Sequence, residues 1–264
     1  MQRRQFLAAS LASSALALAG KVSAEEPEDK QREYYQLRRY TMQTGPQTGL
    51  TEKYFSEAML PALKRMEMGP IGAFRLDIGP ETPTFYLLIP GRHLEALATI
   101  DLTLAQDSVF MDAAQPFWNA PAIAPAFLRV ESSLHAAFEG WPRITPPAGA
   151  ATKAKRIFQM RTYESPSYQD HVRKVEMFNS AEMEIFKNAG FHPVFFGDTL
   201  LGPRTPSLTY MLSFTDIDAL NAQWDVFKAD PAWKKLQSSP RFGFEAIVSN
   251  ISNLILSPLS MSQI

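Results

Sequence analysis

The chain has 264 residues, of which 45% are hydrophobic, and it carries 26 basic and 27 acidic side chains but no cysteine. This composition predicts a globular protein with a substantial core, and the lack of cysteine excludes disulfides, thiolate nucleophiles, cysteine-ligated zinc and iron–sulfur clusters. Because the charges nearly balance, no basic field is available to hold a nucleic acid or an anionic membrane, and we expect neither as a partner.

The first segment has the pattern of an export signal. An Arg-Arg-x-Phe-Leu run at residues 3–7 precedes an apolar stretch at 8–20, and small residues end the segment at Ala24. The stretch is too short to span a bilayer well, which favours a cleavable signal peptide over residues 1–24. The run resembles the twin-arginine signal, with a general-secretion signal as the alternative. We therefore expect a bacterial periplasmic protein, in which residues 25–33 form a disordered linker.

The rest of the chain contains an internal duplication. When the sequence is shifted by 123 residues, segment 36–107 aligns with a later part of the chain without a gap. Several shared residues are glycine or proline at turns, so chance is a poor explanation. Segment 140–155 holds Pro-Pro, Gly and Ala and no apolar period, which predicts a linker between two domains, 34–139 and 156–264. The identical pairs include Gln36 and Gln159, Arg38 and Arg161, Tyr40 and Tyr163, Phe55 and Phe178, and Gly79 and Gly202.

The first copy predicts two helical regions between extended runs. Its first helix has apolar side chains at the spacing of one helical face, and a Gly-Pro-x-Thr-Pro turn joins the next two extended runs into a hairpin. The apolar stripe consists of Phe55, Met59, Ala62, Leu63 and Met66. In chain order we predict a strand at 35–41, the striped helix, strands at 71–78 and 84–89, a helical region at 94–106 and a strand at 126–138.

The second copy predicts the same order of elements. Its helix carries the matching stripe Phe178, Ile185, Phe186 and Ala189. The strands are expected at 156–164, 194–201, 208–214 and 244–256, and the second helical region at 217–228. The order β-α-β-β-α-β is that of a ferredoxin-like unit, so we predict an α+β fold with two such units in tandem.

A single ferredoxin-like unit leaves one face of its sheet bare. Its helices lie on the other face, so something else must cover the bare one, and the second copy is the obvious cover. Two sheets packed face to face and a closed eight-strand barrel both satisfy this requirement. The sequence leaves open whether a barrel closes within one chain or between chains.

The opening of each copy carries a family resemblance. The runs Tyr-Gln-Leu-Arg-Arg-Tyr at 35–40 and Phe-Gln-Met-Arg-Thr-Tyr at 158–163, each followed by a helix, a Gly-Pro hairpin and a final strand, resemble the NIPSNAP family of the dimeric α+β barrel superfamily. The resemblance covers about residues 34–256 and implies a pseudo-dimeric barrel with a central cavity. Superfamily relatives include cofactor-free mono-oxygenases and haem proteins, so a haem cofactor stays open. The family offers no catalytic residue to transfer.

Strand alternation predicts a polar inner face. Arg38 and Tyr40 share one face of the first strand, and the second copy repeats them. In the last strand of the first copy, His135 shares a polar face with two charged residues. The predicted ligand-binding residues are Arg38, Tyr40, Arg129, Glu131, Arg161 and Tyr163. The alternative is that these arginines form structural ion pairs or face solvent.

Three further side chains are candidates for catalysis. Glu182 interrupts the apolar stripe at the position of Met59; burial would raise its pKa and let it act as a base, whereas at the stripe's edge it would only reach water. His135 and His171 are candidate haem ligands or proton-transfer groups, with a structural role as the alternative. No histidines stand at metal-ligand spacing, so we predict no metal site.

Three functions follow from these features. The first is an exported NIPSNAP-like protein that binds a small, partly apolar ligand in the barrel cavity. The second is a cofactor-free or haem-dependent oxidoreductase, such as a mono-oxygenase, that uses the same cavity. The third is a structural protein that forms a homodimer. The serine-hydrolase elbow, the phosphate-binding loop and the Rossmann glycine pattern do not occur in the sequence, so those classes lose their usual support.

Overall fold

The computed structural model describes residues 32–264, with the side chains of residues 244 and 245 left out. The predicted signal peptide, 1–24, and most of the predicted linker, 25–33, lie outside the described residues. Within residues 32–264 none of the helices combines the length and the apolar character that a membrane span requires.

The two copies fold into matching sets of elements. The first contains β1 (Tyr34–Thr41), α1 (Pro46–Tyr54), the π-helical turn η1 (Phe55–Met59), α2 (Leu60–Arg65), β2 (Gly72–Ile78), β3 (Thr84–Gly91), α3 (Leu94–Ala98), α4 (Ile100–Leu104), α5 (Ser108–Trp118) and β4 (Arg129–Ala137). The second contains β5 (Ile157–Glu164), α6 (Tyr168–Met177), η2 (Phe178–Glu182), α7 (Met183–Asn188), β6 (His192–Leu201), β7 (Ser207–Phe214), α8 (Ile217–Ala229), α9 (Pro231–Gln237), α10 (Phe244–Ile247) and β8 (Asn250–Pro258). Strands β3 and β7 and the turns η1 and η2 stand 123 residues apart, which confirms the duplication at its predicted offset.

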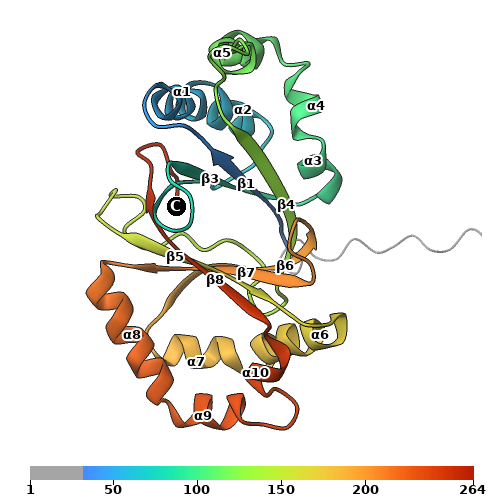
Figure 1. Cartoon of the computed structure of the whole chain (residues 1–264), viewed down its shortest axis with the longest axis vertical. Helices are drawn as coiled ribbons and strands as arrows, with labels where there is room; N and C mark the ends of the chain where they lie inside the picture. Colours follow the sequence, from blue (N-terminus) through green and yellow to red (C-terminus); the bar gives the residue numbers. More distant parts are fainter. Residues whose placement is uncertain (1–31) are drawn as a thin grey trace, which may run out of the picture. The chain divides into compact units, whose positions relative to one another are not determined.

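All eight strands form one closed barrel within a single chain. Their order is β1-β3-β2-β8-β5-β7-β6-β4, and every neighbouring pair is antiparallel. The pairs β2–β8 and β4–β6 join the first repeat to the second. Figure 1 shows the helices of each repeat on the outside of the barrel, those of the first repeat along one side and those of the second along the opposite side. The α+β fold of two tandem ferredoxin-like units is therefore present, and the barrel closes within the chain.

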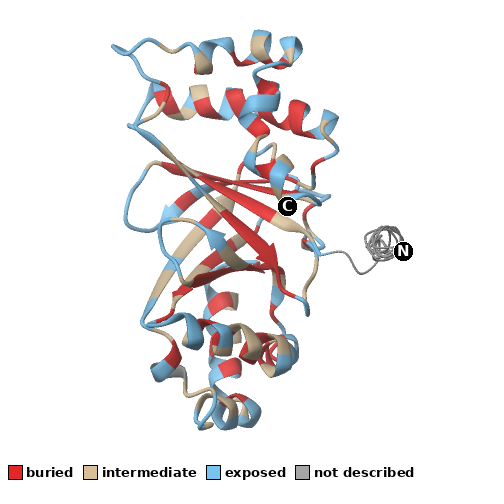
Figure 2. Cartoon of the chain, turned by 90° about the vertical axis from the view of Figure 1, so that its right-hand side faces the viewer, coloured by how far each residue is buried: buried red, intermediate tan, exposed pale blue. Residues whose placement is uncertain are grey.

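Three apolar cores hold this arrangement together. Each repeat has a core between its helices and the outer face of its strands, and the predicted stripes lie in these two cores, with Phe55, Met59, Phe178 and Phe186 fully buried. The third core, which we call the barrel core, fills part of the barrel interior and draws on both repeats. Figure 2 shows buried residues along the strands and on the helix faces that meet them. Because burial of apolar surface is the main stabilising term, the barrel core makes each repeat depend on the other.

The ends of both repeats differ from the predicted elements. Region 94–106 forms two short helices, α3 and α4, in place of one helical region. The last strand of the second repeat begins at Asn250, because α10 occupies Phe244–Ile247 and packs against α6. Helices α5 and α9 were not predicted; a side-chain cap marks the start of each, since the carboxylates of Asp107 and Asp230 accept hydrogen bonds from backbone N–H groups of the first turn.

Candidate functional site

A cavity of about 560 Å³ lies inside the barrel. On β1 and β5 the side chains that face inward change from apolar to polar from the start of the strand to its end. They are Tyr35, Leu37 and Arg39 on β1, and Phe158, Met160 and Thr162 on β5. The apolar members belong to the barrel core, and Leu37, Arg39, Met160 and Thr162 line the cavity. The other lining residues are Pro80, Tyr86, Glu131, Ser132, Ser133, His135, Thr199, Pro203, Arg204, Ser207, Thr209, Asn250, Ile251, Ser252, Asn253 and Leu254.

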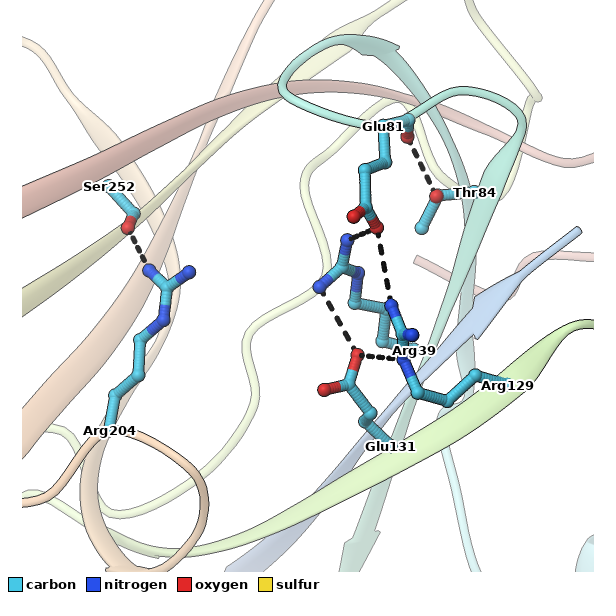
Figure 3. Close-up of polar contacts among 7 residues, drawn as sticks. All are labelled: Arg39, Glu81, Thr84, Arg129, Glu131, Arg204 and Ser252. Carbon is cyan, nitrogen blue, oxygen red and sulfur yellow. Dashed lines mark hydrogen bonds and ion pairs between the residues drawn. The ribbon is translucent and has the colours of Figure 1, made fainter.

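Charged side chains of both signs surround the mouth of this cavity (Figure 3). Arg39 pairs with Glu81 and, at 3.2 Å, with Glu131. Arg129 lies 3.6 Å from the carboxylate of Glu81 and 3.3 Å from that of Glu131, so the two arginines and two glutamates form one neutral cluster. These pairs are partly exposed, so each contributes at most about 1 kcal/mol. The cluster therefore positions the rim and adds little net field.

Arg204 stands apart from that cluster. It donates to the hydroxyl of Ser252 (Figure 3). It also lies 3.6 Å from the carboxylate of Glu164, which balances its charge. The turn between β6 and β7 carries Arg204, whereas Ser252 lies on β8. This contact therefore ties the turn to the β8 side of the barrel.

A chain of hydrogen bonds runs through the cavity wall around His135. Ser207 donates to Thr199 at 3.0 Å, the hydroxyl of Thr199 lies 3.2 Å from Nδ1 of His135, and Nε2 lies 2.8 Å from the hydroxyl of Ser133. Burial lowers the pKa of His135 to about 4, so its imidazole is neutral at pH 7. Because Thr199 accepts from Ser207, its own hydroxyl proton is donated to Nδ1 of His135. Nε2 therefore carries the proton of the neutral ring and donates it to the hydroxyl of Ser133. The cavity wall thus contains a neutral imidazole whose two nitrogens are both hydrogen-bonded.

A glycine allows His135 to lie close to the neighbouring strand. Gly197 on β6 faces β4, and a Cβ atom built there would stand 2.9 Å from the Cβ of His135. Real Cβ atoms essentially never approach so closely, and any larger residue would displace the imidazole from its two hydroxyl partners. The smallest residue at this position therefore helps to fix the geometry of the wall.

Two of the predicted site residues line this cavity and a third lies at its rim. Glu131 and His135 point into it, as the alternation of β4 predicts. Arg129 is half exposed and meets the cavity only through its ion pairs with the two rim glutamates.

The predicted placement of Arg38 and Tyr40 is wrong. Both lie on the outer face of β1, under the helices: Arg38 pairs with Asp101 of α4 at 2.8 Å and donates to Gln36 at 2.6 Å, and Tyr40 packs edge-on against Phe55. Two arginines stand side by side in the sequence, and alternation assigns them to opposite faces without saying which faces inward. The ion pair with Asp101 places Arg38 outside the barrel, so Arg39 faces the cavity instead.

Arg161, Tyr163 and Glu182 meet at a different cavity. It has a volume of about 500 Å³ and lies between the outer face of β5 and β8 and the helices of the second repeat, with Trp224 of α8 in its wall. The prediction that Arg161 and Tyr163 face the barrel interior is therefore wrong, because alternation places them on one face of the strand without saying which face points inward.

Glu182 is buried, as one of the two sequence readings proposed. Its side chain is 1% exposed and accepts a hydrogen bond of 2.6 Å from Lys174, which is 0% exposed. Burial raises the pKa of Glu182 and lowers that of Lys174, whereas each partner's charge opposes the shift of the other. This pair replaces Met59 and Thr51 of the first repeat, where the same helix positions carry no charge.

Sequence reasoning missed four charged residues that the structure brings to these sites. Arg39, Glu81 and Arg204 lie at the mouth, and their ion pairs join turns and strands far apart in the chain. Lys174 precedes Glu182 by eight residues, which places them about 12 Å apart along the axis of an α-helix, so the spacing alone does not predict that they touch. The π-helical turn η2, which ends at Glu182, departs from regular α-helical spacing between them.

The described residues do not fit a haem ligand set. Both ring nitrogens of His135 bond hydroxyl groups. Nε2 of His171 lies 2.7 Å from Asp198 of β6, and this histidine lines neither cavity. The other two histidines, His93 and His192, are exposed. Within residues 32–264, no group of three or more His, Asp or Glu side chains is placed to hold a metal ion.

Comparisons with known proteins agree on the fold. Residues 158–263 match the NIPSNAP family. A candidate monooxygenase from Lactobacillus acidophilus NCFM has a similar structure over 86% of this chain and 94% of its own, with a TM-score of 0.54 and 12% identity. A candidate monooxygenase from Fusobacterium nucleatum is similar over 87% of this chain and 93% of its own, with a TM-score of 0.54 and 9% identity. An anthrone oxidase-like protein is similar over 88% of this chain and 92% of its own, with a TM-score of 0.53 and 12% identity. No curated protein matches the sequence.

These matches bear on the resemblance seen in the sequence. The family match covers the second repeat, and the structural matches extend across both repeats. At 9–12% identity the structural matches show the fold alone. The second repeat is therefore a NIPSNAP domain, and the chain as a whole has an α+β barrel fold similar to that of these solved structures.

Proposed function

We propose that the central cavity binds a small, partly apolar molecule. The observation that carries this proposal is the cavity itself: its volume of about 560 Å³ lies in the range of small-molecule pockets. Leu37 and Met160 supply apolar surface next to the barrel core, and hydroxyl groups supply hydrogen-bond partners along the wall. A barrel that served only as a structural unit would have no need of such a space in its interior.

The charges at the mouth favour an uncharged ligand. Arg39, Arg129 and Arg204 are each matched by a glutamate, so no cation is left to attract an anion. The wall offers Ser, Thr and Asn side chains, which both donate and accept hydrogen bonds. A compound with an apolar body and several hydroxyl or carbonyl groups fits this chemistry.

Affinity selection with a cavity-filling variant tests this proposal. The protein is incubated with a periplasmic extract, separated from unbound compounds and denatured, and the released molecules are identified by mass spectrometry. Thr162→Trp places an indole in the cavity, and Thr103→Trp places the same ring on an exposed face of α4 as the matched control. We expect the wild type and the control to retain a compound that Thr162→Trp does not. Equal retention by all three, or none by the wild type, would contradict the proposal.

We also propose export by the twin-arginine route, supported by the Arg-Arg-x-Phe-Leu run and the apolar stretch after it. Cell fractionation of the full chain tests this. Replacing Arg3 and Arg4 with lysine keeps the charge and removes the arginine pair. We expect the wild type in the periplasm and this variant in the cytoplasm. Periplasmic recovery of both would indicate general secretion instead.

His135 favours one alternative, a cofactor-free oxygenase. Its neutral imidazole and the hydroxyl chain could pass a proton from a bound phenol or enol, and two structural relatives are candidate monooxygenases and a third is anthrone oxidase-like. Oxygen uptake with a panel of anthrones and quinols tests this alternative. It requires uptake by the wild type that falls at least tenfold in His135→Gln. If no compound is oxidised, or if the variant is equally active, the oxygenase alternative is wrong and the proposal of ligand binding alone remains.

A further inference from the structure

The duplication places an arginine in the same position of both repeats, buried in the first and partly buried in the second, with different partners. Arg38 in the first repeat has an internal anion, because Asp101 lies 2.8 Å away and Gln36 accepts a further hydrogen bond. Arg161 stands 123 residues later on the equivalent strand. Among the described residues no carboxylate lies within ion-pair distance of Arg161, and its Nε atom is buried without an acceptor.

The missing partner can be traced to one position. The residue 123 positions after Asp101 is Trp224 on α8, so an aromatic ring replaces the carboxylate. The guanidinium of Arg161 stands 4.5 Å from the indole of Trp224 and 5.1 Å from the ring of Tyr163. Trp224 donates to Gln159 at 2.6 Å, which fixes the indole in this orientation. Two rings and a hydrogen bond to the hydroxyl of Tyr210 therefore hold the guanidinium at the cavity wall, and no carboxylate of the described residues forms an ion pair with it.

The remaining charges around this cavity cancel in pairs. Glu182 bonds Lys174, and whether that pair is ionised or has exchanged its proton, it carries no net charge. At the rim, Asp225 lies 3.4 Å from Lys228. Burial lowers the pKa of Arg161, but Tyr210, Tyr163 and Glu182 raise it by more, so the guanidinium stays charged. The second cavity thus holds one cation in excess, where the equivalent region of the first repeat is neutral.

Part of the cavity wall is apolar and aromatic. Leu220, Phe227 and Trp233 line it together with Trp224, and the volume of about 500 Å³ accommodates a ring-sized molecule. A single guanidinium matches the planar, singly charged carboxylate group, whose two oxygens accept parallel hydrogen bonds.

We propose that the second cavity binds a small monocarboxylate with an apolar or aromatic body. The carboxylate of the ligand pairs with Arg161 and takes the place that Asp101 holds in the first repeat, and its body lies against the aromatic wall. This site is separate from the central barrel cavity, which has balanced charges and a hydroxyl-lined wall.

Phenylacetate and its neutral analogue phenylacetamide test the proposal. Binding is measured by titration calorimetry, and nuclear Overhauser contacts in the wild type locate the ring protons of the ligand relative to the indole of Trp224. We expect phenylacetate to bind at least tenfold more tightly than the amide and to contact Trp224. Equal affinity of acid and amide, contacts elsewhere, or no binding of phenylacetate, benzoate or indole-3-acetate at millimolar concentrations would overturn the proposal.

Paired variants separate this site from the rest of the molecule. Arg161→Gln removes the cation, and Arg38→Gln is the matched change in the first repeat; the first should weaken phenylacetate binding at least tenfold and the second should not change it. Trp224→Asp supplies the internal carboxylate of the first repeat and should also abolish binding. Thr162→Trp fills the central cavity and should leave phenylacetate affinity unchanged. Loss of phenylacetate binding in Arg38→Gln or Thr162→Trp, with a folded protein by near-ultraviolet circular dichroism, would contradict this assignment.

Discussion

The imidazole of His135 is buried between the hydroxyl groups of Ser133 and Thr199, in a place where a charged ring would have lost its hydration. Burial therefore lowers the pKa of His135 from its ordinary 6.5 to about 4 in the folded protein. Between these two pH values the unfolded chain binds a proton that the folded chain does not. Folding stability must fall as the pH decreases through this window.

This effect predicts a specific pH dependence. His135 should reduce the free energy of unfolding by about 3 kcal/mol between pH 7 and pH 4, whereas His135→Gln has no such titration. Urea unfolding of both proteins at several pH values in this window measures the difference. Parallel curves for the wild type and the variant across the whole window would show that His135 keeps an ordinary pKa.

The Lys174–Glu182 pair gives a second prediction at the residue scale. Glu182→Gln leaves a buried ammonium group without its anion, and should destabilise the fold by about 3 to 5 kcal/mol. Exchanging both residues for their first-repeat counterparts, Lys174→Thr with Glu182→Met, removes both charges and should restore most of that loss. Thermal unfolding of the two variants checks this. A double variant as unstable as the single one would show that the loss does not come from the unpaired charge.

For single residues, the sequence predicted which residue types lie near a cavity better than it predicted which face of a strand each side chain occupies. Glu131, His135 and Glu182 were predicted as polar groups in or near a cavity, and each lines one. Arg38 was assigned to the wrong face, because either of the adjacent arginines at 38 and 39 satisfies the alternation rule equally well. Only the partner Asp101, which is 63 residues away, decides between them.

Helix α8 is the element on which the second cavity depends, since it carries Trp224. It begins at a capping residue: the carboxylate of Asp216 accepts a hydrogen bond of 2.8 Å from the backbone N–H of Ala219. Asp216→Ala should lower the free energy of unfolding by about 1 kcal/mol, whereas Asp216→Asn keeps an acceptor and should cost only a few tenths. Urea unfolding compares the three proteins. Equal losses in both variants would mean that the cap does not stabilise α8.

Element predictions succeeded where apolar periodicity was long and failed where local contacts decide. The stripes of both first helices and the strands of both hairpins are present in the structure. The turn α10 was read as the start of a strand, because a four-residue helix leaves almost no periodicity and is held by packing on α6. The π-helical turns cannot be read from 3.6-residue spacing at all.

At the scale of the whole molecule, the barrel core makes the two repeats one folding unit. Phe74 of the first repeat packs against Phe158 of the second at 4.9 Å, and Tyr35 packs against Phe195 at 5.3 Å. Unfolding either repeat alone would expose this shared surface and two strand edges.

We therefore predict a single cooperative unfolding transition. Thermal unfolding should give equal calorimetric and van't Hoff enthalpies for residues 32–264. Fluorescence of Trp118 reports on the first repeat and that of Trp224 on the second. We compare a variant in which Trp118 is the tryptophan kept in the helices with a variant in which Trp224 is the one kept. The unfolding midpoints of the two variants should coincide. Two separated midpoints would show that the repeats fold independently.

The whole-molecule fold was predictable up to its closure. The duplication and the order of elements predicted two ferredoxin-like units with their bare faces turned to each other. They did not choose between a face-to-face sandwich and a barrel, because both cover the same apolar residues. The choice rests on the edge pairings β2–β8 and β4–β6, which involve residues up to 184 positions apart and leave no local pattern.

The central claim is that the barrel holds a small molecule, and native mass spectrometry of the protein recovered from its own cells tests it most directly. An absorbance spectrum is recorded on the same sample. We predict a bound mass that disappears in Thr162→Trp, together with a spectrum free of the Soret band of haem. A bare chain in the wild type that stays bare after incubation with periplasmic extract, or a bound mass that Thr162→Trp retains, would contradict the claim.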